Sequence, residues 1–238
     1  MIRYGWWKVM VVVALFGVCA LTTVGAQGTT YTDPQGRYSF TVPSGWQQGM
    51  PPPNTNLPAG TAIGAVYTAA PPLNGNFNVV TVAVPADAGV NLDQIVTQSR
   101  AGVAQSVPGY QEGPGGIQNL TVGGQPARRY DYFLTPQGAG KLHGAQVISL
   151  QANTVYINTF TAADNDFDAF FQQGTTALNS FKFLGTGGAT TATLPNTGRP
   201  VGASWQIIPE SLVLLVGGTL IVAGSLFRRR VSSSSSRA

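Results

Sequence analysis

The feature that most constrains this 238-residue chain is an uncharged, apolar run over residues 211–227. At about 1.5 Å per helical residue, this run would span about 25 Å, near the minimum for a bilayer core. Arg228, Arg229 and Arg230 follow at once, and such cations stay on the cytoplasmic side of a membrane. We therefore predict a transmembrane helix over residues 211–227, with the preceding chain outside the membrane. A buried core helix is the alternative, but the basic tail over residues 228–238 would give it little to pack against.

The N-terminus predicts export. Two cations within the first eight residues precede an apolar stretch over residues 9–20, and the small or short residues 24–26 follow. This order is typical of a secretory signal peptide, here residues 1–26, with Gln27 as the first residue of the mature chain. An uncleaved membrane anchor is the alternative.

The only cysteine, Cys19, lies inside this predicted signal peptide. Val18 precedes it, where lipoprotein signals place Gly, Ala or Ser, so lipid attachment is not favoured. The mature chain would then have no cysteine, which removes disulfides, thiolate nucleophiles and thiolate metal ligands. An exported domain of this kind has to be held together by its core.

The charge distribution argues against nucleic-acid binding. The formal net charge is +4, but residues 27–197 carry six Lys and Arg against eight Asp and Glu, a net of −2. The excess of positive charge therefore lies in the two tails, whereas a nucleic-acid binder concentrates it on a folded face. Charged residues make up only 9% of the chain, against about 25% in an average soluble domain.

Residues 194–198 read Leu-Pro-Asn-Thr-Gly. A linker of small residues (185–193) precedes this pentapeptide, and a spacer (199–210) and the apolar run follow it. Together these parts resemble the LPXTG cell-wall sorting signal of sortase substrates. The resemblance implies recognition of five residues by a sortase: Leu194, Pro195, Asn196, Thr197 and Gly198. It also implies cleavage between Thr197 and Gly198, with Thr197 then joined to a peptidoglycan amine.

Two departures from the usual sorting signal keep a second interpretation open. Thirteen residues separate Gly198 from Leu212, and residues 231–238 prolong the tail beyond the arginines. A plain transmembrane anchor that is never cleaved is therefore the alternative.

The body, residues 27–184, has the length of one domain, and strand signals dominate it. Alternating or β-branched runs predict strands over residues 37–42, 61–69, 77–84, 117–122, 127–134, 144–150 and 154–161. Gly123-Gly124 and Ala152-Asn153 are two-residue hairpin signals.

Two segments have helical spacing of apolar residues. The first covers residues 91–107, with Asn91 as a capping residue. The second covers residues 164–183 and places several phenylalanines on one side, with Gly174 in its interior. The order of strands, helix, strands and helix predicts an α+β fold, a sandwich with two helices packed on a largely antiparallel sheet.

Residues 31–46 contain an aromatic, an Asp, a Gly turn, an aromatic-Ser-aromatic triplet and Pro-x-Gly-Trp. This order resembles the opening hairpin of PsbP-like domains, and residues 123–130 with the late aromatic helix are similar too. The resemblance implies a PsbP-like fold that serves as an extrinsic binding or assembly part. It supplies no catalytic motif. We interpret Trp46 as core packing of the hairpin, with ligand stacking as the alternative.

Candidate metal or catalytic residues are few. Asp164, Asp166 and Asp168 have the spacing that begins a calcium loop, but Ala169 and Thr175 stand where the loop requires Gly and Glu. Capping of the second helix is the preferred interpretation. His143 is the only histidine; without ligand-spaced partners or a nucleophile motif, we interpret it as an exposed hairpin residue.

A glycine-rich segment, a pair of arginines and a pair of carboxylates were also considered as functional sites. Residues 113–116 lack the Lys-Ser/Thr of a phosphate loop and predict a turn. Arg128 and Arg129 should lie on opposite sheet faces, and a solvated pair is preferred over an anion site. Asp131 and Glu112 are the only carboxylates we nominate for a hydrolase, although strand alternation does not bring them together.

The sequence thus predicts no catalytic residue, cofactor or metal. The leading hypothesis is a non-enzymatic surface protein, at the cell wall or membrane, that binds an extracellular ligand or protein partner. Sortase, peptidoglycan and the membrane are its predicted anchoring partners. A membrane-anchored accessory subunit of an envelope complex is the alternative, and an anchored hydrolase is a third.

Overall fold

The computed structural model describes residues 28–51, 57, 59–107, 109–136 and 140–185. The predicted signal peptide, sorting motif and apolar run lie outside these residues. Within the described part, no helix is long and apolar enough to cross a membrane.

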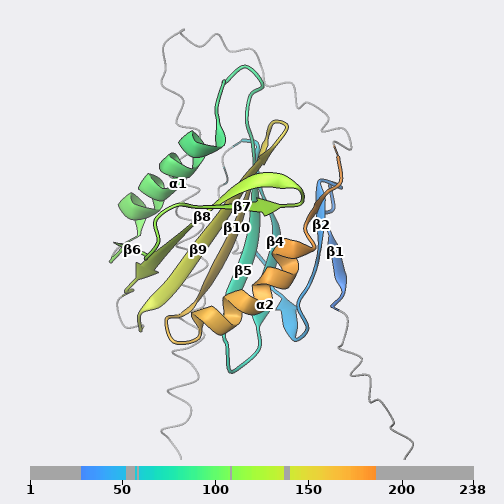
Figure 1. Ribbon diagram of the computed structural model, residues 1–238. Helices are drawn as coiled ribbons and strands as arrows, with labels where there is room; N and C mark the ends of the chain where they lie inside the picture. Colours follow the sequence, from blue (N-terminus) through green and yellow to red (C-terminus); the bar gives the residue numbers. More distant parts are fainter. Residues whose placement is uncertain (1–27, 52–56, 58, 108, 137–139, 186–238) are drawn as a thin grey trace, which may run out of the picture.

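The alternating segments of the sequence form two antiparallel sheets (Figure 1). The larger sheet has eight strands in the order β3-β4-β5-β10-β9-β8-β6, and β7 also pairs with β8. The smaller has the order β1-β2-β11. The strands of the larger sheet are β3 (Trp46–Gln48), β4 (Thr61–Ala69), β5 (Asn76–Ala83), β6 (Gln111–Glu112), β7 (Gln118–Val122), β8 (Gln125–Leu134), β9 (Leu142–Gln151) and β10 (Thr154–Ala163). Those of the smaller are β1 (Thr30–Thr32), β2 (Tyr38–Thr41) and β11 (Lys182–Phe183). The prediction of two helices on a largely antiparallel sheet is confirmed.

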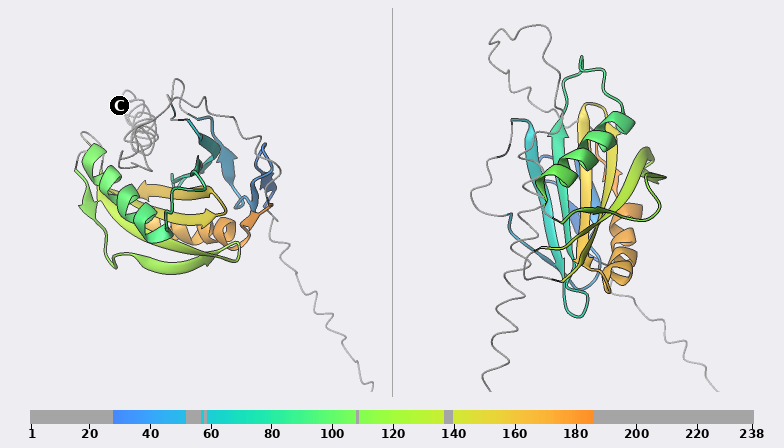
Figure 2. Two further views of the ribbon diagram at one scale, coloured as in Figure 1. Left: turned by 90° about the horizontal axis from the view of Figure 1, so that it is seen from above. Right: turned by 90° about the vertical axis from the view of Figure 1, so that its left-hand side faces the viewer.

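Both faces of the larger sheet are covered, because successive residues of a strand point to opposite sides. On one face, Val80, Ile148 and Ile157 belong to a core that includes helix α1 (Leu92–Ser106). On the other face, Phe77, Phe160 and their neighbours pack with helix α2 (Phe167–Asn179) and the small sheet. Seen from above, the larger sheet is curved, and the two helices cover different parts of it (Figure 2).

Local chemistry explains where α1 begins. The Asn91 side chain accepts a hydrogen bond from the Gln94 N–H at 3.0 Å, and the Gln94 side chain accepts one from the Asn91 N–H at 3.1 Å. This capping box satisfies two backbone donors that a helix start otherwise leaves free. The prediction of a helix at residues 91–107 with Asn91 as its cap is confirmed.

Helix α2 is shorter than the predicted segment of residues 164–183. It ends at Asn179, and the chain then returns to the small sheet as β11. The Ser180 hydroxyl oxygen accepts a hydrogen bond from the Thr41 N–H at 2.8 Å, which fixes this return. Phe181 fits the helical spacing in sequence, but its ring stacks on Tyr38 with 5.1 Å between centroids.

The predicted hairpins and the interpretation of Trp46 hold. Residues 123–124 connect β7 to β8, and residues 152–153 connect β9 to β10. Residues 113–116 lie in the connection from β6 to β7, which includes a turn. Trp46 is buried and stacks on Phe170 with centroids 5.1 Å apart. Its indole N–H donates to the Gln173 side chain at 3.1 Å, so both its ring and its polar atom serve the core.

Candidate functional site around His143

His143 lies on β9 next to the first residue of α2, and its side chain is only 11% exposed. Its ring stacks on Phe167 with centroids 3.6 Å apart and an interplanar angle of 19°. Phe133 is its second aromatic neighbour, at 4.7 Å. The interpretation of His143 as an exposed hairpin residue is therefore wrong. It shares a strand face with Ala145 and Val147, and α2 covers that face.

Both ring nitrogens of His143 face carboxylate oxygens. Nε2 lies 3.3 Å from Asp131 Oδ2, and Nδ1 lies 3.8 Å from Asp164 Oδ1. A neutral imidazole has one N–H and can donate to only one of these carboxylates, whereas a protonated imidazole has two donors. Of the two contacts, only the one between Nε2 and Asp131 is within hydrogen-bond distance.

Arg129 holds the first of these carboxylates from the same strand. Its Nε and Nη2 atoms donate to Asp131 Oδ1 and Oδ2 at 2.7 and 2.6 Å. Burial alone would raise the pKa of Asp131, but hydrogen bonds from His143 and Arg129, together with the charge of Arg129, outweigh it and lower the pKa. Asp131 is therefore a carboxylate at neutral pH. The Arg129 guanidinium in turn lies 3.9 Å from the centroid of Phe171.

Lys141 holds the second carboxylate. Its Nζ lies 3.0 Å from Asp164 Oδ2 and 3.6 Å from the centroid of Phe133. The imidazole of His143 therefore lies between two ion pairs, Arg129–Asp131 and Lys141–Asp164. We call this group the His143 cluster, and it consists of Arg129, Asp131, Lys141, His143 and Asp164.

The three alternating aspartates do not act together. Asp164 belongs to the His143 cluster, so the capping interpretation is wrong for it. Asp166 stands at the N-cap position of α2, but no capping hydrogen bond of its side chain is present among the described residues. Asp168 lies in the first turn, where the helix dipole favours a negative charge. Within the described part of the chain, no three His, Cys, Asp or Glu side chains are arranged to hold a metal ion.

The two adjacent arginines point to opposite faces, as alternation predicted, but neither is simply solvated. Arg129 faces α2, while Arg128 Nε lies 2.8 Å from Asp93 Oδ1, beside the start of α1. The carboxylates nominated for a hydrolase also go to different partners. Glu112 binds Arg100 at 2.7 Å, and Asp131 binds Arg129.

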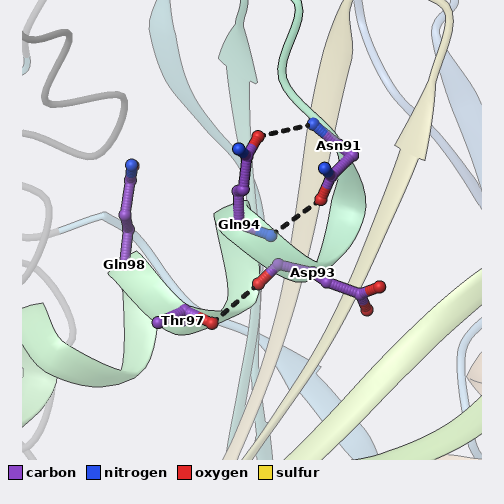
Figure 3. Close-up of a pocket in the computed structure, with 5 residues that line it drawn as sticks. All are labelled: Asn91, Asp93, Gln94, Thr97 and Gln98. Carbon is purple, nitrogen blue, oxygen red and sulfur yellow. Dashed lines mark hydrogen bonds between the residues drawn. The ribbon is translucent and has the colours of Figure 1, made fainter.

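A shallow depression of about 400 Å³ lies at the start of α1 (Figure 3). It is lined by Asn91, Asp93, Gln94, Thr97 and Gln98. Asn91 and Gln94 are bonded to each other in the capping box, and the Thr97 hydroxyl donates to the Asp93 carbonyl at 2.8 Å. These hydrogen bonds stabilise the helix start, and we assign the depression no ligand.

Two buried polar groups were missed from the sequence. Arg37 donates to both carboxylate oxygens of Asp33 at 2.7 Å, a bidentate pair that closes the turn before β2. Gln146 Oε1 accepts hydrogen bonds from the hydroxyls of Ser99 and Tyr130, both at 2.7 Å, beneath α1. The four-residue spacing of Asp33 and Arg37 across a predicted turn was a usable signal. The hydrogen bonds of Gln146 join α1, β8 and β9, and no local sequence pattern indicated them.

No family model matches this sequence, and no curated protein matches it significantly. Three solved structures illustrate what the domain resembles. CyanoP, the cyanobacterial PsbP of Synechocystis sp. PCC 6803, is 16% identical with a TM-score of 0.47, over 71% of this chain and 98% of CyanoP. LpqN, involved in cell envelope biogenesis of Mycobacterium tuberculosis, is 12% identical with a TM-score of 0.43, over 68% of this chain and 87% of LpqN. The Saccharomyces cerevisiae Ran-binding protein Mog1p is 10% identical with a TM-score of 0.43, over 66% of this chain and 95% of Mog1p. A PsbP protein, the kind of domain that the opening hairpin resembles, is thus among the similar structures.

Proposed function

We propose that this chain is an exported, non-enzymatic protein whose α+β domain binds or positions a partner at the cell envelope. A sortase cleaves it between Thr197 and Gly198 and joins Thr197 to peptidoglycan. The observation that carries this proposal is the order of the C-terminal signals: the LPNTG pentapeptide, an apolar run and three arginines. Each part has a distinct physical task, because the pentapeptide is the substrate while the other two hold it at the outer membrane face.

The end of the folded domain supports this arrangement. The Leu184 N–H donates to the Arg37 carbonyl at 3.0 Å, so the fold holds the chain up to the start of the predicted linker. The thirteen residues from the end of the domain to the attachment point, 185–197, reach at most about 45 Å when fully extended. A wall-anchored domain would therefore lie close to the wall, and its partner would have to be reached there.

The non-enzymatic part of the proposal is supported by the ion pairs. A glycoside hydrolase that acts on wall or extracellular polymer needs two carboxylates that share a cleft. Asp131 and Glu112, the pair that the sequence offered, are bonded to Arg129 and Arg100 respectively.

The decisive experiment separates muramidase-digested wall from membranes of the producing cells and determines the mass of the C-terminal peptide. We expect wild-type protein in the wall fraction, with a peptide that ends at Thr197 and carries wall fragments. Thr197→Ala should remain in the membrane fraction with residues 211–227 still attached. Thr193→Ala, a matched change just outside the pentapeptide, should behave like wild type. A wild-type peptide that retains residues 211–227 and comes only from membranes would refute sortase anchoring.

The long spacing and the extended tail favour a second candidate, a single-pass accessory subunit of an envelope or membrane complex. In that case residues 211–227 would be a permanent anchor, and Thr197→Ala would change nothing. Cross-linking in intact cells should then recover one stoichiometric membrane partner. Recovery of wall fragments on Thr197 would contradict this candidate.

A further inference from the structure

We propose that two copies of this protein associate through the free edge of β7, so that their large sheets join as one antiparallel sheet. Within the described part of the chain, β7 pairs with β8 alone, and most of its residues are exposed. The other edge strands of the two sheets, β1, β3, β6 and β11, have only two or three residues each. A longer free edge presents a row of backbone N–H and C=O groups that can pair with another strand.

The register of β7 on β8 shows which backbone groups face outward. Val122 and Gln125 flank a turn of two glycines with positive φ, so they form a hydrogen-bonded pair. Such pairs alternate along an antiparallel ladder, and the N–H and C=O groups of Asn119 and Thr121 therefore point away from β8. Pro126, which has no N–H, lies opposite Thr121, as this alternation requires. Among the described residues, neither outward-facing residue has a backbone partner on that side.

A two-fold axis at Leu120 uses all of these groups. It lays Gln118–Val122 along the same segment of the second copy, with Leu120 opposite its own copy and Asn119 opposite Thr121. Residues 119 and 121 both face outward, so each such pair can exchange both N–H···O bonds. The central leucines form a non-hydrogen-bonded pair, in which the side chains of opposite residues lie closest together.

The absence of charge favours a second copy as the occupant. In a two-fold contact the same surface meets itself, so a charge in its centre would face a like charge. Residues 113–127 contain no charged residue, and β7 itself has neither the charge nor the proline that protects many edge strands, whereas β6 carries Glu112. Ile117, directly before β7, is 41% exposed and one of the few large apolar side chains in solvent among the described residues. In this register it lies opposite Gly123 of the second copy, where no side chain opposes it.

The first test measures the mass of the full chain in detergent micelles by sedimentation, with the solvent density matched to the detergent. The mass should rise from one protomer to two over about a hundredfold increase in protein concentration. The double variant Asn119→Glu, Thr121→Glu places like charges opposite each other and should weaken the association about tenfold, while Asn119→Glu, Thr121→Lys places opposite charges there and should restore it. Both change the same exposed positions, and a carboxylate at residue 119 lies beside Arg128 of β8 in each.

A single-protomer mass at every concentration, or equal association of the two double variants, would overturn the proposal. The pairing does not depend on whether Thr197 is cleaved. Failure of the dimer therefore leaves the proposed anchoring standing, and failure of the anchoring leaves the dimer standing.

A cysteine scan tests the register. In a Cys19→Ser background the chain has no thiol, and only a residue on the two-fold axis meets its own copy. Leu120→Cys should therefore give a disulfide-linked dimer under mild oxidation. Thr121→Cys is more exposed but lies too far from its own copy for a disulfide, and it should stay largely monomeric. Equal or stronger cross-linking through residue 121 would overturn this register. If Leu120→Cys does not fold, the two charge variants still decide whether β7 is the interface.

Discussion

Replacement of Gly174 by alanine should destabilise this protein, although the same change stabilises most exposed helices. Gly174 lies inside α2 and faces β10. A Cβ atom at this position would lie 2.3 Å from Cε1 of Phe160 and 2.9 Å from Cδ1 of the same ring. The ring has little freedom to turn away, because Phe160 is fully buried and packs against Phe77 and Phe171 with centroids 4.7 and 5.0 Å apart.

The magnitude follows from two opposing contributions. Alanine favours a helix interior over glycine by about 1 kcal/mol. Overpacking a close-packed core costs about 1–3 kcal/mol, and a 2.3 Å approach to a ring carbon belongs at the upper end. The net loss in the free energy of unfolding should be about 1–2 kcal/mol, which corresponds to a Tm lower by about 2–8 °C.

Urea and thermal unfolding followed by circular dichroism would measure this difference. Thr176→Ala, on the exposed side of the same helix, is the matched control and should change stability by less than about 0.7 kcal/mol, in the favourable direction. If Gly174→Ala raised the Tm as the control does, the packing of α2 on β10 described above would be wrong.

Three further substitutions test other parts of the fold. Trp46→Ala removes the stack on Phe170 and should cost about 3–5 kcal/mol in urea unfolding, with Trp46→Phe clearly milder. Burial opposes ionisation of Asp33, but the hydrogen bonds and charge of Arg37 lower the pKa of its carboxyl. The stabilisation that the Asp33 carboxylate provides is therefore complete above about pH 4 and is lost as the pH falls further. In wild type the urea midpoint should fall between about pH 4 and 2, and in Asp33→Asn this fall should be smaller. An equally steep fall in the variant would contradict this prediction. Ser99→Ala removes a buried hydrogen bond beneath α1 and should cost about 1–2 kcal/mol, whereas an unchanged midpoint would show that this bond does not stabilise the fold.

Local patterns predicted most of the regular structure. β4 was predicted within its observed bounds, Thr61–Ala69, because β-branched and apolar residues mark it and a turn cluster follows it. The helix after Asn91 was predicted because its cap is encoded by residues three apart. The short strands β1, β3, β6 and β11 were missed, since strands of two or three residues carry no periodicity of their own. β3 and β11 lie where Trp46 and Phe181 pack into the aromatic core.

The sequence by itself determined most of the long strands, the start of α1, the class of the domain and the predicted sorting motif at Thr197. These depend on neighbouring residues, whose order is explicit in the chain. Only the tertiary structure decided the environment of His143, whose carboxylate partners Asp131 and Asp164 lie 12 and 21 positions away in sequence. Sheet register and the docking of α2 bring these groups together, so their interaction energy depends on distances that no local pattern contains.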